Sequence, residues 1–153
     1  MSDPRQVAAG RAASGQRPAR DDDVADICLS LPEVELGITW GDRPTYVVPR
    51  GEKGRGFCLY RMPHPTATDP DTGEQWDDIL VITTPDAEAK AELVQADGPF
   101  FTIPHFDRSN AVLVRRSRLG EITRSELVEV LTEAWAARAP KRLVREHREA
   151  SGG

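Results

Sequence analysis

The segment 123–143 (TRSELVEVLTEAWAARAPKRL) constrains the fold most strongly, because it carries the start, the buried face and the end of one helix. Thr123 followed by Glu126 predicts a capping box at the first turn. Apolar residues then recur at helical spacing up to Trp135, which predicts that this face of the helix is buried in a core. Pro140 is expected to break or kink the helix, and a basic tail follows it.

Upstream of this helix, the apolar pattern changes to the period of two that is typical of β-strands. Turn-forming glycine and proline residues separate the apolar runs. The predicted strands cover 34–40, 45–48, 56–62, 79–83 and 111–114. The run 79–83 (ILVIT) is continuously apolar, which is typical of a central strand.

Two shorter helices are predicted among the strands. A run of three aspartates opens the first, over 21–31, and is expected to supply its N-cap and first-turn acids. Pro85 and Asp86 open the second, which reaches about Gln95. The order of helix, strands, helix, strands and helix predicts a single α+β domain with a mainly antiparallel sheet.

The two ends of the chain are predicted to lie outside this domain. Residues 1–20 are rich in Ala, Gly, Ser, Pro and Arg without apolar periodicity, which predicts a disordered basic N-terminal arm. An arm that reaches into a DNA groove is the alternative interpretation. The domain itself is expected to cover 21–146, and 147–153 is expected to be a flexible tail.

The net charge of −5 is unevenly distributed along the chain. Residues 1–20 and 138–153 each carry +3, so the segment between them carries −11. This acidic body argues against tight nucleic-acid binding, for which a basic domain is more typical. No apolar run approaches the roughly 20 residues that span a bilayer, and the N-terminus has no secretory signal. Cys28 and Cys58 form no C-x-x-C motif, so we expect small core residues in a reducing cytoplasm.

Three passages stand in order along the chain: LSLPEVELGITWGDRPTYVV, FFTIPHFDRSNAVLVR and LTEAWAARAPKRL. Together they resemble the MmcQ/YjbR family of small bacterial proteins, in its actinobacterial-type branch, over about residues 22–144. The resemblance implies a compact α+β domain whose antiparallel sheet is flanked by helices, an arrangement described as double-wing or frataxin-like (CyaY-like). It also implies DNA binding, although a shared fold does not fix function. Many relatives carry Trp at the start of the last strand, where this chain has Asn110, Ala111 and Val112, so no role of that Trp transfers.

Cations near the ends of the last strand and the last helix are the predicted nucleic-acid-binding residues. They are Arg115, Arg116, Arg118, Arg138, Lys141, Arg142 and Arg145. If the two ends meet in space, these side chains would hold a phosphate backbone of duplex DNA, with low sequence specificity and strong salt dependence. The alternative is that they are solvated charges, with Arg138 paired to Glu133 or Glu146. The leading prediction is therefore a non-enzymatic DNA-binding protein.

A small-molecule or protein-binding module is the alternative function, with a pocket on the sheet face around Trp40, Tyr46, His105 and Asp107. His105 and Asp107 would suit a general base and its orienting carboxylate, but no nucleophile motif accompanies them. A loop histidine with a structural hydrogen bond is the favoured interpretation. The loop 69–74 lacks the ligand pattern of a calcium site, and the histidines are too scattered for zinc. We expect no catalysis, metal or cofactor.

Overall fold

The computed structural model describes residues 16–39, 43–61 and 67–152. Within these ranges the chain forms a five-stranded sheet in which each strand pairs with the next along the chain, in the order β1-β2-β3-β4-β5. All of these pairs are antiparallel. The strands are β1 (Glu35–Thr39), β2 (Arg43–Val48), β3 (Arg55–Arg61), β4 (Ile79–Thr83) and β5 (Ala111–Arg115). The β-rich runs of the sequence therefore form the predicted antiparallel sheet.

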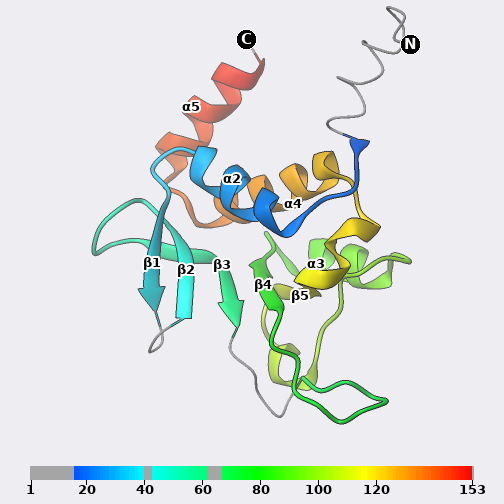
Figure 1. Ribbon diagram of the computed structural model, residues 1–153. Helices are drawn as coiled ribbons and strands as arrows, with labels where there is room; N and C mark the ends of the chain where they lie inside the picture. The colour runs from blue at the N-terminus through cyan, green and yellow to red at the C-terminus, as the bar shows by residue number, and fades with distance from the viewer. Residues whose placement is uncertain (1–15, 40–42, 62–66, 153) are drawn as a thin grey trace, which may run out of the picture.

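Helices complete the described fold. They are α2 (Asp21–Ser30), α3 (Ala87–Gln95), α4 (Arg124–Arg138) and α5 (Lys141–Gly152), with the short 3-10 helices η1 (Pro104–Phe106) and η2 (Arg116–Glu121). Figure 1 shows α2 and α4 together on one side of the sheet, with α5 rising from the end of α4 away from the strands. This arrangement confirms the predicted single α+β domain with flanking helices.

The larger core lies between the sheet and the layer of α2 and α4. Tyr46, Cys58 and Ile82 are register partners on neighbouring strands, so their side chains project to the same face. All three are buried there together with Trp135 of α4. The indole Nε1 of Trp135 donates a hydrogen bond to the Pro32 carbonyl at 3.0 Å. The predicted burial of Trp135 is therefore confirmed, and this side chain links α4 to the turn after α2.

A smaller core covers the opposite face of β4 and β5. Ile79, Val81 and Leu113 pack there against Trp76 and Phe101, which come from segments outside the sheet. Phe101 and Leu113 exchange backbone hydrogen bonds of 2.9 and 2.8 Å. Both faces of β4 are therefore buried, which explains why its sequence shows no polar alternation.

The helix starts confirm one capping prediction and correct another. At α4, the Thr123 hydroxyl accepts the backbone N–H of Glu126 at 3.1 Å, which closes the predicted capping box. At α2, the N-cap is Arg20 rather than a residue of the aspartate run, and the Asp23 carboxylate accepts the Arg20 backbone N–H at 2.8 Å. The aspartates still occupy the first turn, where negative charge stabilises the helix dipole.

The C-terminal segment departs from the prediction. Pro140 ends α4, but the chain becomes helical again at once, so residues 147–152, predicted as a flexible tail, belong to α5. Leu143 is buried, and the His147 ring packs edge-on against Trp135 with 5.1 Å between ring centroids. This packing stabilises a helix that its polar sequence alone would leave marginal.

The residues just before α2 also pack on the domain. The Ala19 backbone N–H donates to the Ile122 carbonyl, and the Arg124 N–H donates to the Arg17 carbonyl, each at 2.9 Å. Ala19 is buried. The end of the predicted N-terminal arm is therefore part of the folded unit, whereas residues 1–15 lie outside the described part of the chain.

Candidate nucleic-acid interface

Arg115, the last residue of β5, is held by a carboxylate and an aromatic ring. Its Nε donates to Asp78 Oδ1 at 2.9 Å, and its guanidinium lies 4.9 Å from the centre of the Trp76 ring. Partial burial tends to raise the pKa of Asp78, but hydrogen bonds from Ser117 and Arg115 outweigh burial and lower that pKa below its usual value. Asp78 is therefore ionised at neutral pH and neutralises Arg115.

The next two cations of the predicted cluster are paired in a similar way. Arg116 makes a two-point contact with the Asp21 carboxylate, at 2.8 and 2.7 Å, and its guanidinium lies over the Tyr60 ring. Arg118 pairs with Glu121 at the end of η2. These hydrogen bonds raise the pKa of both guanidinium groups. A phosphate would have to displace a carboxylate from each arginine in order to bind it.

The C-terminal helix α5 carries four exposed cations, Lys141, Arg142, Arg145 and Arg148. Lys141, Arg145 and Arg148 are spaced by four and three residues, which places them on one face of the helix. None of the three has an ion-pair partner among the described residues. Arg142 lies beside them and pairs with two glutamates. Arg148 was not among the predicted site residues, and its place on this face would have followed from the helical spacing if the tail had been predicted as a helix.

The structure does not bring the two predicted groups of cations together. Arg116 contacts Asp21 at the start of α2, whereas Arg142 lies 3.7 Å from Glu33, just past the end of α2. The 15 residues of α4 also separate η2 from α5, a length of about 22 Å. The predicted cluster therefore forms two separate surfaces. On the one formed by Arg115, Arg116 and Arg118, carboxylates already neutralise the cations.

Arg138 was predicted together with the C-terminal cations, but it is the last residue of α4 and does not lie on α5. It is half-buried, and its Nε is closed off from solvent without an acceptor in the described part of the chain. The predicted pairing with Glu133 or Glu146 is not among the ion pairs of the described residues, and Glu146 lies near Arg142 instead. Arg138 lines cavities at the end of β4, beside Thr83.

The residues predicted to line a ligand pocket are not assembled around one cavity. Tyr46 is buried in the larger core, where its hydroxyl lies 2.8 Å from that of Tyr60. Burial and this hydrogen bond raise the pKa of Tyr46, so it stays protonated. Asp107 is exposed and lines a separate cavity of about 410 Å³ between α3 and the segment 102–110. Trp40 and the side chain of His105 lie outside what the structure describes.

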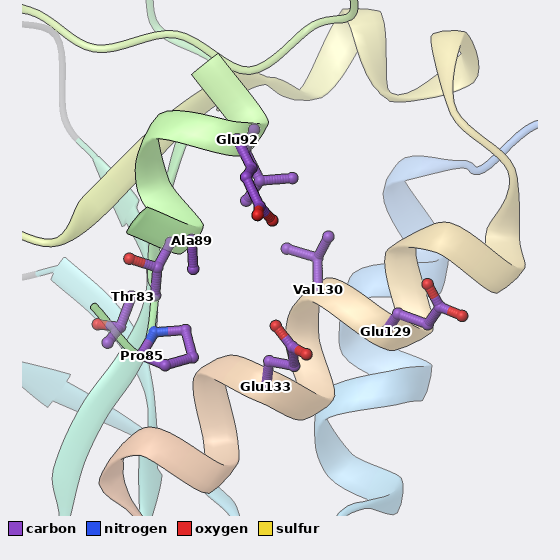
Figure 2. A pocket seen from close by; sticks show the side chains of 9 residues that line it. Thr83, Pro85, Ala89, Glu92, Glu129, Val130 and Glu133 are labelled. Atoms are coloured by element: carbon purple, nitrogen blue, oxygen red, sulfur yellow. The ribbon is translucent and has the colours of Figure 1, made fainter. Parts of the chain in front are cut away.

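An acidic cleft between α3 and α4 was not anticipated from the sequence. Figure 2 shows Glu92 of α3 and Glu133 of α4 extending into the space between the helices, near Pro85. Glu129, one turn before Glu133, borders the same cleft of about 150 Å³. Glu92 lies on α3, whereas Glu129 and Glu133 lie on α4, far along the sequence. The sequence therefore showed only the i, i+4 spacing of the two α4 residues and not their proximity to Glu92. This surface would repel a phosphate backbone.

Neither a cluster of metal-ligating side chains nor a membrane-spanning helix is found in the described ranges. No group of three or more His, Cys, Asp and Glu side chains there is arranged to hold a metal ion. No helix in those ranges combines the length and apolar character needed to cross a bilayer.

Comparisons with known proteins agree with the fold described above. The model of the YjbR family matches residues 29–137, from the end of α2 to the end of α4. The chain belongs to the YjbR family. Uncharacterized protein Rv2570 of Mycobacterium tuberculosis and uncharacterized protein Mb2600 of Mycobacterium bovis are each 46% identical to this YjbR protein over 68 residues. The match covers 44% of the chain and spans half the length of each relative.

One solved structure supports the fold. Deinococcus radiodurans protein DR2400, a DUF419 domain, aligns with a TM-score of 0.51 at 22% identity. The alignment covers 80% of this chain and 78% of that protein. Similarity at this level of identity shows the shared fold and leaves function to the geometry of the individual surfaces.

Proposed function

We propose that this YjbR protein is a non-enzymatic, cytoplasmic protein that binds duplex nucleic acid weakly, through the exposed cations of α5. We call Lys141, Arg145 and Arg148 the α5 stripe. The observation that carries the proposal is that these three cations share one helix face and have no ion-pair partner among the described residues. Cations free of carboxylates are available to neutralise phosphates.

The anchoring of α5 supports this use. Leu143 is buried, and His147 packs on Trp135, so the face opposite the stripe is attached to the domain. The stripe runs from Lys141 to Arg148, seven helical rises or about 10 Å. A duplex carries about six phosphates over such a length, so three cations have enough phosphates to contact.

The rest of the surface limits the affinity. The paired arginines after β5 contribute little free positive charge, and the cleft with Glu92 and Glu133 is negative. Backbone contacts carry no sequence information. We therefore expect weak binding that is insensitive to sequence and strongly sensitive to salt.

The buried thiols support the non-enzymatic part of the proposal. Cys28 and Cys58 are both buried and free. Burial, reinforced by the neighbouring Cys28, raises the pKa of the Cys58 thiol well above its usual value. A buried, protonated thiol is a poor nucleophile.

Fluorescence anisotropy with a labelled mixed-sequence duplex, repeated over a salt series, tests the proposal. Three phosphate contacts predict a slope of about −2.7 for the logarithm of the binding constant against the logarithm of salt concentration. The triple variant Lys141→Gln, Arg145→Gln, Arg148→Gln should lose most of the binding and most of this slope.

A matched variant separates local contacts from net charge. Lys53→Gln, Arg108→Gln and Arg118→Gln together remove the same three charges from exposed positions elsewhere. This control should bind nearly as well as the unmodified protein. Equal loss of binding in both triple variants, or no binding at low salt, would refute the role of the α5 stripe.

A further inference from the structure

Arg138 is a half-buried cation whose position the fold alone does not explain. Its Nε is shielded from solvent and has no acceptor among the described residues. In contrast, Arg115, Arg116 and Arg124 each contact a carboxylate. A buried donor without an acceptor is destabilising. Arg138 also lines a cavity, so an anion placed there would meet its positive charge.

Arg138 borders a cavity of about 240 Å³ that opens on the sheet. Thr45 pairs with Leu59, and Leu59 pairs with Val81, so these three lining side chains project to the same face. Leu59 and Val81 belong to the smaller core, so this part of the lining lies on the face opposite α2 and α4, while Phe57 and Cys58 of the larger core also border the cavity. Arg138 reaches it from the end of α4, next to Thr83 at the end of β4.

The lining of this cavity combines positive charge with an apolar floor. Arg55, at the start of β3, also borders it, and no acidic residue stands among its described lining residues. Thr83 contributes a hydroxyl, while Leu59 and Val81 contribute hydrocarbon surface. In a chain with a net charge of −5, a cavity with two arginines and no carboxylate favours an anionic ligand.

We propose that this cavity binds a small organic acid, with the carboxylate at Arg138 and Arg55 and the hydrocarbon part against Leu59 and Val81. A guanidinium presents a planar fork of donors that matches a carboxylate or a phosphate. The cavity has room for about eight water molecules at about 30 Å³ each, which suits an acid of a few carbon atoms. The site is distinct from the α5 stripe and does not depend on nucleic-acid binding.

Titration with hexanoate tests this site directly. The methyl signals of Leu59 and Val81, followed by NMR in isotope-labelled protein, should shift and saturate, with half-saturation on the order of 1 mM for so small a ligand. 1-Hexanol, which lacks the charge, and inorganic phosphate, which lacks the hydrocarbon, should each bind at least about tenfold more weakly.

Two variants locate the anion. Arg138→Met keeps an apolar stem without the charge and should weaken hexanoate binding at least about tenfold. Arg108→Gln, at an exposed position that does not line this cavity, is the control and should leave hexanoate binding unchanged. Because Arg55 is exposed, Arg55→Met should fold even if Arg138→Met does not, and it should weaken binding in the same direction.

Three results would overturn the proposal. The first is the absence of a saturable shift with hexanoate. The second is binding that persists unchanged in a folded Arg138→Met variant, or in Arg55→Met if Arg138→Met does not fold. The third is phosphate or hexanol binding as tightly as hexanoate, since either would show that charge and hydrocarbon are not recognised together.

Discussion

The Asp23 carboxylate is the most highly connected ionised group in the described structure, which makes its loss a sharp test. Arg17 contacts it at two points, 2.9 and 2.6 Å, and the backbone N–H of Arg20 donates to it at 2.8 Å. Arg124 Nε adds a contact at 3.3 Å. Because Arg124 opens α4 and Asp23 lies in α2, this one carboxylate joins the two helices to the segment before them.

We expect Asp23→Asn to lower the free energy of unfolding by about 2 kcal/mol. Removing one partner of a fully buried ion pair costs about 3–5 kcal/mol. The Asp23 side chain is only 4% exposed, but Arg17 and Arg124 are 27% and 33% exposed and can regain water. This solvent access reduces the cost to about 2 kcal/mol. A domain of this size should then lose roughly 4–8 °C in melting temperature.

The effect must depend on pH in a defined direction. Hydrogen bonds from Arg17, followed by the Arg20 backbone contact and the nearby positive charge, lower the pKa of Asp23 despite its burial. Stability contributed by a carboxylate with a lowered pKa is fully present above the unfolded-state pKa of about 3.9 and is lost as pH falls through the folded value. The stability difference between the unmodified protein and the Asp23→Asn variant should therefore be constant near neutral pH and shrink below about pH 4.

Urea unfolding followed by far-UV circular dichroism, from neutral pH to about pH 3, measures this difference. Asp22→Asn is the control, because Asp22 lies in the same first turn but is exposed. The control should change the free energy of unfolding by less than about 0.5 kcal/mol. Equal stability of the Asp23→Asn and unmodified proteins at neutral pH, or a difference that persists in acid, would refute the reasoning.

Two further changes test the packing. Trp135→Ala should lower the free energy of unfolding in urea by about 3–5 kcal/mol, because it empties a fully buried site. The same variant should speed amide hydrogen exchange in α5. Unchanged exchange would contradict the docking of His147 on Trp135. Gly54→Ala should cost about 1–3 kcal/mol, because a Cβ there would lie 2.7 Å from the Pro49 carbonyl oxygen. Gly98→Ala is the control, because a Cβ there meets nothing within 4 Å, and it should leave the free energy of unfolding nearly unchanged. Equal melting temperatures of the Gly54→Ala and Gly98→Ala variants would contradict the close approach at Gly54.

Most of the fold could be predicted because its signals are local. The capping box at Thr123 and Glu126 lies within four consecutive residues, and the strand runs show their period directly. The helix that follows α4, α5, was missed because Pro140 was interpreted only as a helix breaker. Proline is also favoured at the start of a helix, and the apolar contacts of Leu143 and His147 that stabilise α5 are tertiary.

The candidate site was less predictable because charge pairing is not local. Arg116 meets Asp21 across 95 residues, and Arg115 meets Asp78 across 37 residues. Neither pairing leaves a pattern in the sequence, so paired and unpaired arginines look alike there. For the same reason Arg138 was grouped with the other cations, although its cavity depends on how α4 ends against β4.

The position of the nucleic-acid contact is tested most directly by backbone amide NMR spectra recorded while an unlabelled duplex is added at low salt. We predict that the largest shift changes fall in α5 around Lys141, Arg145 and Arg148, and that they vanish as salt is raised. Shift changes centred on Arg115, Arg116 and Arg118, or no changes at any duplex concentration, would contradict a contact through the α5 stripe.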